Sequence, residues 1–169
     1  MGIEIERKFL TTSDAWRQAA HRVVEMAQGY LNDSESVVAG RQNASVRVRL
    51  EGEDARLNIK SREMGASRQE FDYPIPVEDA RALVALCVGG TVLKRRYFVH
   101  HAGHEWEIDE FLGDNAGLVV AEVELDAEDE AFAMPDWAGR EVTHLPRYYN
   151  LNLVAHPFSK WNDEARHPA

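Results

Sequence analysis

The sequence predicts a mainly β domain of the α+β class, in which antiparallel strands form the sheet and a few short helices pack outside it. Segments with alternating apolar and charged residues recur along the 169-residue chain, and such alternation indicates strands with two different faces. Turn residues separate neighbouring segments at hairpin spacing. Helical patterns are few and short, so the chain is expected to be built mainly from strands.

The first part of the chain is predicted to contain two strands and one short helix. Residues 3–8, IEIERK, alternate strictly, so the isoleucines face one way and the charged side chains face the other. Ser13 or Asp14 is placed to cap a short helix. Residues 24–31 are a second short strand, and residues 35–44 are predicted to be a loop because turn residues interrupt them.

The middle of the chain is predicted to form a meander of three strands. Residues 44–52 and 53–62 both alternate, and the turn-forming sequence EGED joins them as a hairpin. Residues 67–76 alternate as well. This third strand is expected to end at its prolines, because proline cannot donate a hydrogen bond to a central ladder.

A helix and a second hairpin are predicted to follow. The helix covers residues 77–88 and is expected to stop at Gly89 and Gly90. Residues 91–101 and 104–113 then alternate around a short turn, which indicates another antiparallel pair.

Beyond that hairpin, residues 117–126 are predicted to be the last strand. Residues 127–134 are predicted to form a short helix with an acidic, solvated start. The remaining aromatic residues, from 135 to 161, show no regular period and are expected to be irregular.

Composition narrows the classes of function. The net charge of −10 argues against a nucleic-acid partner, because attraction to a polyanion needs basic surface. Cys87 is the single cysteine, so no intramolecular disulfide is possible, and its apolar surroundings favour a buried, inert thiol. No apolar run approaches the roughly 20 residues that cross a bilayer, and no basic leader is evident, so a cytoplasmic protein without a membrane partner is expected.

Charged residues are paired in an unusual way on the predicted strands. A single strand of this kind ordinarily buries its apolar face and exposes its charges. Here, however, each of these strands carries a pair of charges two residues apart, each pair has a single sign, and like charges so placed repel one another. The basic positions are Lys8, Arg47, Arg49, Lys60, Arg62, Lys94 and Arg96, and the acidic positions are Glu4, Glu6, Glu107, Asp109, Glu122 and Glu124.

The two sets suit a phosphorylated ligand that binds together with a metal ion. Arginine forks match phosphate oxygens, and clustered carboxylates match a hard divalent cation such as Mg²⁺ or Mn²⁺. If the sheet closed into a barrel with its charged faces inside, a linear polyphosphate and its metal could satisfy both sets. A barrel of about eight strands has an interior wide enough for one small ligand.

Eight segments resemble, in order along the chain, the motifs of the CYTH superfamily, the triphosphate tunnel metalloenzymes. They are EIERKF, RVRL, LNIKSR, SRQEFDYPI, LKRRYF, WEIDEF, AEVEL and WAGREVT, and they extend to about Asn150. The resemblance implies an eight-stranded antiparallel closed β-barrel, the triphosphate tunnel, with a few helices packed outside. Residues 1–169 are then one CYTH domain with a core of residues 1–150 and a tail, 151–169, that covers or plugs the barrel.

The resemblance also implies roles for the charged residues. The metal ion, Mg²⁺ or Mn²⁺, is expected to bind Glu4, Glu6, Glu122 and Glu124, with Glu107 and Asp109 contributing directly or through water. The triphosphate is expected to bind Lys8, Arg47, Arg49, Lys60, Arg62, Lys94 and Arg96, which also offset charge that develops during phosphoryl transfer.

Three residues are predicted to be catalytic: Lys60, Tyr30 and Lys8. Tyr30 and Lys60 resemble the pair that helps to activate water in the triphosphatase branch of the superfamily. A lysine among other cations can have a lowered pKa and act as a base. Activation of the water by a glutamate is equally compatible with the sequence.

The expected reaction is metal-dependent hydrolysis of inorganic triphosphate to diphosphate and phosphate. Two other enzymes remain possible, a class IV adenylyl cyclase that converts ATP to cyclic AMP and diphosphate, and a thiamine triphosphatase. A polyphosphate- or nucleotide-binding module without turnover is a further alternative, although phosphate binding alone does not need paired carboxylates. The expected partner is the small-molecule triphosphate, and the chain is expected to be a monomer or a homodimer.

Other conspicuous residues favour simpler interpretations. His100, His101 and His104 flank a turn, so an exposed hairpin tip is a better prediction than a metal site. Arg68 and Glu70 could reach the tunnel or could form a salt bridge at its rim.

Overall fold

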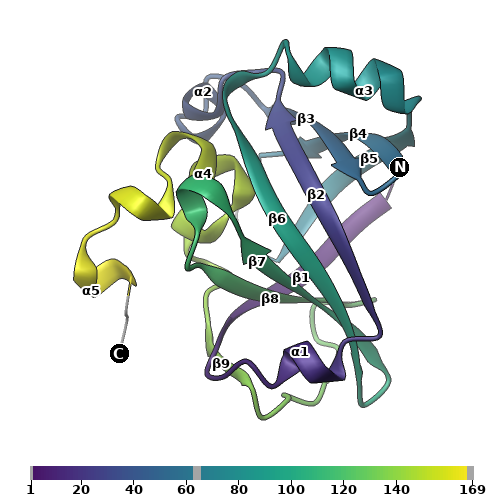
Figure 1. Ribbon diagram of the computed structural model, residues 1–169, viewed down its shortest axis with the longest axis vertical. Coiled ribbons are helices and arrows are strands. Elements are labelled where there is room, and N and C mark those ends of the chain that lie inside the picture. The colour runs from purple at the N-terminus through teal and green to yellow at the C-terminus, as the bar shows by residue number, and fades with distance from the viewer. Residues whose placement is uncertain (1, 63–65, 167–169) are drawn as a thin grey trace.

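The computed structural model describes residues 2–62 and 66–166, and its strands form one antiparallel sheet (Figure 1). The strands are β1 (Gly2–Thr11), β2 (Arg22–Tyr30), β3 (Ala44–Glu51), β4 (Asp54–Ser61), β5 (Ser67–Pro74), β6 (Val88–His101), β7 (His104–Phe111), β8 (Val119–Glu124) and β9 (Ala138–Glu141). Neighbouring strands follow the order β5-β4-β3-β2-β6-β7-β8-β1-β9.

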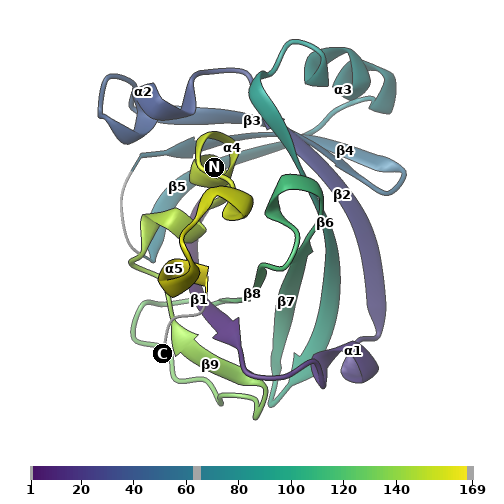
Figure 2. The ribbon, with the colours of Figure 1, turned by 60° about the vertical axis from the view of Figure 1, so that its left-hand side comes forward.

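Strand β1 closes the sheet into a barrel because its two halves have different partners. Gly2 to Ile5 pair with β5, and Glu6 to Leu10 pair with β8. The predicted eight-stranded antiparallel barrel, β1 to β8, is therefore confirmed, and Figure 2 shows these strands curving around a common axis. Strand β9 pairs with the end of β1 as a ninth strand outside the closed ring.

Short helices lie outside the ring of strands. They are α1 (Trp16–Ala19), α2 (Ser34–Val38), α3 (Val77–Val84), α4 (Asn150–Ala155) and α5 (Asp163–Arg166), with 3-10 turns η1 (Gly113–Asn115), η2 (Pro146–Tyr148) and η3 (Phe158–Lys160). Helix α3 packs on β3 and β4, and α1 packs on β6. Within the described part of the chain, no helix is both long enough and apolar enough to cross a membrane.

Most of the apolar core lies between the outer face of the barrel and the segments that cover it. Phe9, Trp106 and Val123 point outward from β1, β7 and β8 and are buried against Trp16 and Trp137. Burying such side chains stabilises each by about 1.5–3 kcal/mol. The apolar halves of the alternating strands therefore form the core, which leaves the charged halves facing inward.

A second apolar cluster closes one end of the barrel. Phe111 and Val120 lie at this end of β7 and β8, on the same strand faces as the inward charges, and they contact Tyr148, Leu153 and Phe158. The segment from η2 to η3 thus covers this end of the barrel, where α4 lies close to the strands in Figure 2. The charged part of the interior opens toward the other end.

Several elements differ from the expected ones. The segment predicted as a loop at 35–44 begins within helix α2, because Asp33 caps it by accepting hydrogen bonds from Glu35 N and Ser36 N. The predicted cap of α1 by Ser13 or Asp14 is wrong, since the N-cap residue is Ala15 and no side chain caps it.

Two further corrections concern segments that precede or follow strands. Helix α3 ends at Val84 rather than at residue 88, and Gly89 and Gly90 belong to β6 instead of stopping the helix. The helix predicted at 127–134 is absent, and its residues form turns and extended chain. Strand β8 is not the last strand, because β9 follows it.

Candidate active site

The charged faces of β1 and β8 meet inside the barrel. Glu6 lies opposite Glu124 in the antiparallel register, and Lys8 lies opposite Glu122. Directly opposed residues project from the same face of a sheet, so these four side chains share one wall. Three carboxylates are thereby concentrated around one lysine.

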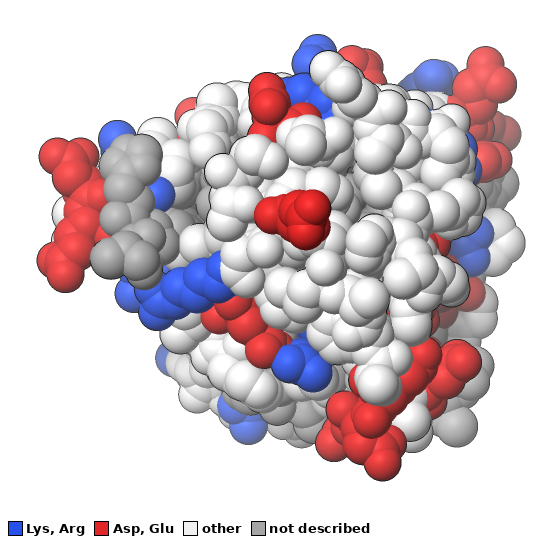
Figure 3. All heavy atoms as spheres, turned by 90° about the horizontal axis from the view of Figure 1, so that it is seen from below, with Lys and Arg blue, Asp and Glu red and all other residues white. Residues whose placement is uncertain are grey.

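A cavity of about 350 Å³ lies between this wall and the basic residues of β3 to β5. Most of the residues predicted from the sequence line it. They are Glu4, Glu6, Lys8, Tyr30, Arg47, Arg49, Lys60, Arg62, Arg96, Glu107, Glu122 and Glu124. The pairs of like charge on the strands predicted that these side chains would converge, and the cavity brings them together. By contrast, the face that carries α1, shown in Figure 3, is mostly uncharged, and its acidic side chains gather mainly toward the edges.

Lys94 and Asp109 are the two predicted residues that do not line this cavity. Both are fully buried, and Lys94 Nζ lies 2.5 Å from Asp109 Oδ2. Arg96 Nε donates to the other carboxylate oxygen at 2.7 Å. Burial raises the pKa of Asp109, but Arg96 and Lys94 outweigh it and hold that pKa below its ordinary value. Both oxygens of Asp109 are therefore engaged in orienting Arg96.

Glu4 and Glu6 are held by cations from three strands. Glu4 accepts hydrogen bonds from Lys60 at 2.6 Å and from Arg68 at 2.9 Å. Glu6 accepts from Lys8 at 2.7 Å and from Arg68 at 2.5 Å. Burial raises the pKa of Glu6, yet Lys8 and Arg68 keep it well below its ordinary value, so this carboxylate is ionised.

Glu122 links this group to Arg96. Lys8 Nζ donates to Glu122 Oε1 at 2.6 Å, and Arg96 Nη2 lies 3.3 Å from Oε2. Burial lowers the pKa of Lys8, but Glu122 and Glu6 raise it by more, so the ammonium stays charged. Lys8 is consequently a fixed positive charge at the centre of the carboxylates.

Two carboxylates nearer the open end are incompletely neutralised. Within residues 2–62 and 66–166, no cation forms an ion pair with Glu124. Burial, followed by Glu4 and Glu107, raises the pKa of Glu124. Glu107 contacts Arg96 through one oxygen, and burial also raises its pKa. The acidic wall thus has an excess of negative charge that a cation could neutralise.

The basic wall has the opposite excess. Arg49 forms an ion pair with Glu51, with Nη2 3.1 Å from Oε2, but its Nε is buried without a hydrogen-bond partner. Burial and the neighbouring Arg47 lower the pKa of Arg49, and the same two causes lower the pKa of Lys60. Arg49 is thus a crowded and incompletely paired cation, which suits it to binding an anion.

Tyr30 lines the cavity from the end of β2, opposite Arg47 on β3. Its ring is buried, and burial raises the pKa of the phenol, although Arg47, Arg68 and Lys8 oppose this. The hydroxyl is therefore protonated at neutral pH and can donate a hydrogen bond to an oxygen within the cavity.

The structure decides between the two alternatives for Arg68 and adds a residue that was not predicted as part of the site. Arg68 lines the cavity and holds both Glu4 and Glu6, so it lies in the tunnel. Tyr149 lines it as well, with Lys8 Nζ 5.9 Å and the Arg68 guanidinium 5.8 Å from its ring centre. The alternation of residues 67–72 allowed a position in the tunnel for Arg68 but did not decide it, whereas nothing in the aromatic tail singled out Tyr149.

The donor set fits a hard divalent cation. Mg²⁺ and Mn²⁺ prefer oxygen ligands, and Mg²⁺ usually binds one or two carboxylates and completes its coordination with water and substrate phosphates. Glu124 and Glu107 offer carboxylates with unsatisfied negative charge, and Glu4, Glu6 and Glu122 line the same wall. Phosphates bound at the basic wall could supply the remaining oxygens.

Comparison with protein families gives a match to the CYTH domain over residues 2–154. A protein of Acetivibrio thermocellus named inorganic triphosphatase is 42% identical over 164 residues, covering 96% of this chain and all of the relative. A protein of Nitrosomonas europaea with the same name is 35% identical over 154 residues, covering 89% of this chain and 96% of that protein.

Solved structures agree with this match. The crystal structure of an inorganic triphosphatase that is 32% identical superposes with a TM-score of 0.64. The superposition covers 91% of this chain and 95% of the other. The barrel and the order of its strands thus recur in proteins of related sequence.

Proposed function

This chain belongs to the CYTH domain family, and from that membership we propose that it hydrolyses inorganic triphosphate to diphosphate and phosphate within the barrel. The observation that carries the proposal is the division of one cavity into an acidic wall and a basic wall, each with an unneutralised excess. A triphosphate with its metal ion has both charges that this division requires.

The substrate would bind along the basic wall. Arg47, Arg49 and Arg62 present guanidinium groups that suit phosphate oxygens, and Arg68 and Arg96 contact the carboxylates. Lys8 adds a fixed positive charge. Phosphoryl transfer needs mainly positioning and stabilisation of charge on the equatorial and leaving oxygens, which these groups supply.

The metal ion would bind at the acidic wall. Its main ligands would be Glu124 and Glu107, whose negative charge is incompletely neutralised, and Glu4, Glu6 and Glu122 lie on the same wall. We assign Mg²⁺ or Mn²⁺ to this position because all of the donors are oxygens. When bound, such an ion neutralises phosphate oxygens and polarises the phosphoryl group. Asp109 and Lys94, which lie outside the cavity, would act by holding Arg96 in place.

Lys60 and Tyr30 would orient the attacking water. The pKa of Lys60 is lowered by burial and by Arg47, so a neutral amine that accepts a proton is easier to reach than in an isolated lysine. Tyr30 would donate its hydroxyl hydrogen bond to the water or to a phosphate oxygen. Attack of the water oxygen on the terminal phosphorus would break the anhydride bond, so that the transferred group is released as phosphate and the leaving diphosphate remains on the arginines until release.

The experiment that tests this function compares substrates. Purified protein with Mg²⁺ or with Mn²⁺ is given inorganic triphosphate, ATP and thiamine triphosphate at equal concentration, and released phosphate is measured. Cyclic AMP is assayed in the ATP reaction. The proposal predicts rapid phosphate release from inorganic triphosphate in particular. Cyclic AMP and diphosphate from ATP, with little hydrolysis of triphosphate, would instead assign the cavity to a cyclase.

A further inference from the structure

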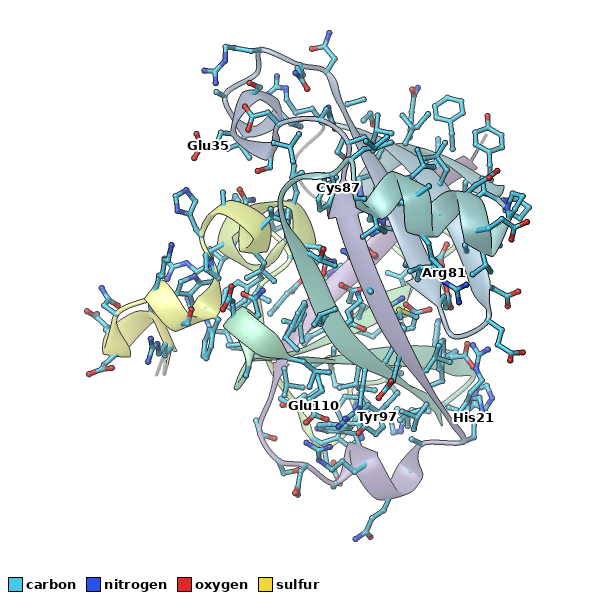
Figure 4. All side chains as sticks on the ribbon, turned by 45° about the horizontal axis from the view of Figure 1, so that its top comes forward. His21, Glu35, Arg81, Cys87, Tyr97 and Glu110 are labelled. Carbon is cyan, nitrogen blue, oxygen red and sulfur yellow. The ribbon has the colours of Figure 1, made fainter. Side chains whose placement is uncertain are left out.

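Two histidines and a glutamate form a compact cluster at the β6–β7 end of the barrel. His100 on β6 lies directly opposite Glu105 on β7. His21 immediately precedes β2, and its backbone N–H donates to Phe98 O at 3.0 Å, which fixes it beside β6. Figure 4 shows His21 at this end of β2, away from Cys87 and α3 at the other end.

The side chains of this cluster face one another. His21 Nε2 lies 3.0 Å from Glu105 Oε2, and His100 Nδ1 lies 3.7 Å from the same oxygen. The two imidazole rings are stacked with centroids 4.1 Å apart and an interplanar angle of 7°. One nitrogen from each histidine and one carboxylate oxygen are all within 4.8 Å of one another.

The sequence predicts an exposed hairpin tip here, but in the structure the histidines of this tip have different partners. His104 Nε2 lies 2.7 Å from Glu130 Oε1 and is engaged on the outer side of the hairpin. His100 is the histidine of this tip that meets a second imidazole, and that imidazole comes from a distant part of the sequence.

We propose that His21, His100 and Glu105 form a binding site for one borderline transition-metal ion, with Zn²⁺ the best match and Co²⁺, Ni²⁺ or Cu²⁺ as substitutes. Imidazole nitrogens select such ions over Mg²⁺, which prefers oxygen. Zn²⁺ with three protein ligands and a water in the fourth position is an established arrangement. This site has a different chemistry from the all-oxygen wall of the cavity.

The three ligands have fixed backbones and accessible side chains. The backbones of all three residues are fixed by hydrogen bonding between β2, β6 and β7. Their side chains are 40%, 69% and 41% exposed for His21, His100 and Glu105, so an ion can enter and a water can complete its coordination. Because each imidazole lone pair lies in its ring plane, the two stacked rings would turn out of parallel as the three ligand atoms converge on one ion, and the exposure of both rings leaves room for this.

The position also has a consequence for the barrel. Glu105 lines the mouth of the cavity, on the same face of β7 as Glu107. An ion at this site would place positive charge at the open end of an acidic wall and would join the start of β2 to the β6–β7 hairpin. It would do so without occupying the position proposed for the catalytic metal.

The test is a Zn²⁺ titration of the full chain by calorimetry, in the presence of excess Mg²⁺ to occupy the oxygen site. The wild type is expected to bind one equivalent of Zn²⁺. His21→Asn and His100→Asn are each expected to weaken that binding by more than about 100-fold, since even outer-shell partners of a metal contribute about 10–100-fold. His101→Asn, a neighbouring histidine outside the cluster, is the matched control and is expected to bind as the wild type does.

Electron paramagnetic resonance of one bound Cu²⁺ equivalent provides a second readout. Coupling to two imidazole nitrogens is expected in the wild type and in His101→Asn, and it is expected to be lost or reduced to one nitrogen in the other two variants. The proposal is overturned if the wild type binds no Zn²⁺ equivalent beyond the Mg²⁺ site. It is equally overturned if His21→Asn and His100→Asn bind with wild-type affinity, whatever the catalytic activity.

Discussion

Glu124 has a different electrostatic environment from the paired glutamates Glu4, Glu6 and Glu122. Those three are held by lysine or arginine side chains, whereas the main causes that raise the pKa of Glu124 are burial and the neighbouring carboxylates. A carboxylate that pairs with no cation of the protein gives up no ion pair when a metal ion binds it. Replacing Glu124 therefore tests its part in metal binding without breaking an ion pair that stabilises the barrel.

Replacing Glu124 with glutamine should weaken metal binding without unfolding the barrel. We expect the Mg²⁺ concentration for half-maximal phosphate release to rise by about tenfold or more, because one charged oxygen ligand is lost. Glu25→Gln is the control, since Glu25 is 76% exposed on the outside of β2. An unchanged metal requirement in Glu124→Gln would contradict the assignment.

Lys60 is expected to act on the rate more than on binding. Lys60→Met removes a cation and a potential base, so we expect kcat to fall by about 100- to 1,000-fold, the range seen when one preorganised catalytic group is lost. KM should change much less if the residue acts mainly in the transition state. Steady-state kinetics with inorganic triphosphate measure both, with Lys160→Met as a surface control. A rise in KM at constant kcat would assign Lys60 to substrate binding alone.

For individual residues, the sequence predicted which face of a strand a side chain occupies more reliably than which side chains it contacts. Alternation placed the charged side chains of six strands on common faces, and most of them line one cavity. The same alternation could not decide whether Arg68 reached the interior, because a rim salt bridge satisfies the same pattern. The meeting of His21 with His100 was beyond reach, since it depends on which strands pair.

The β6–β7 hairpin contains one strained residue. Ala102 has φ of +48° and is followed by Gly103 at +89°, and this pair of positive φ angles suits asparagine or glycine at the first position.

Ala102→Asn should therefore stabilise the domain by about 0.5–1 kcal/mol, because asparagine tolerates the left-handed region better than alanine does. The urea midpoint measures this change. Ala127→Asn, in an exposed segment with ordinary backbone angles, should leave the midpoint nearly unchanged. A lower midpoint in Ala102→Asn would show that the turn is not strained in solution.

Helix α1 is attached to the barrel by a polar contact that responds to pH. Arg17 Nη1 donates to Glu110 Oε2 at 2.7 Å, and the Tyr97 hydroxyl donates to the same oxygen at 3.2 Å. The hydrogen bond from Arg17 is the main reason that the pKa of Glu110 is lowered. Figure 4 labels Tyr97 and Glu110 beside α1.

A carboxyl whose pKa is lowered by folding stabilises the protein above its unfolded pKa of about 4.3, and this contribution disappears as pH falls through the folded value. We expect Glu110→Gln to cost about 0.5 kcal/mol at pH 7, as for a partly exposed ion pair, and the cost to vanish near pH 3. Thermal unfolding from pH 3 to pH 7 measures it, with Glu53→Gln as a control on an exposed turn. A difference that is constant with pH would contradict the ion-pair explanation.

Elements with strict alternation were predicted well, and elements that depend on their surroundings were not. Helix α2 is five residues long and forms because Asp33 caps it, a local signal that turn residues obscured. Strand β9 has four residues and forms because the end of β1 offers an edge, so its pairing is set by tertiary structure. The acidic segment at 127–134 has helix-forming residues, but it contributes no buried residues to the apolar clusters apart from the partly buried Phe132.

At the scale of the whole molecule, the barrel is closed at one end by apolar packing and open at the charged end. Leu153 of α4 is 1% exposed and lies in the cluster that fills the closed end. Leu153→Ala is expected to lower the free energy of unfolding by about 2–4 kcal/mol, the cost of a buried cavity. Leu86→Ala, at a 68% exposed position, should have little effect. Chemical denaturation of both variants checks this, and equal stabilities would argue that the closed end is loosely packed.

The closed barrel was predictable because its motifs occur in order along nearly the whole chain. The pairs of like charge also favoured a ligand bound between the strands, inside a barrel. The location of the closing cluster was not predictable, because the aromatic residues after β9 have no period that assigns them to a face. Their contacts with Phe111 and Val120 follow from the closure of the barrel and not from local sequence.

Hydrolysis of triphosphate that depends on the acidic wall is tested most directly with the double variant Glu122→Gln/Glu124→Gln. The measurement is its rate of phosphate release from inorganic triphosphate with Mg²⁺. The variant removes charge from the acidic wall and leaves Arg47, Arg49 and Arg62 in place. We expect a loss of at least about 100-fold in kcat with triphosphate binding retained. Turnover at the wild-type rate would contradict it, because the carboxylates would then have no part in the reaction.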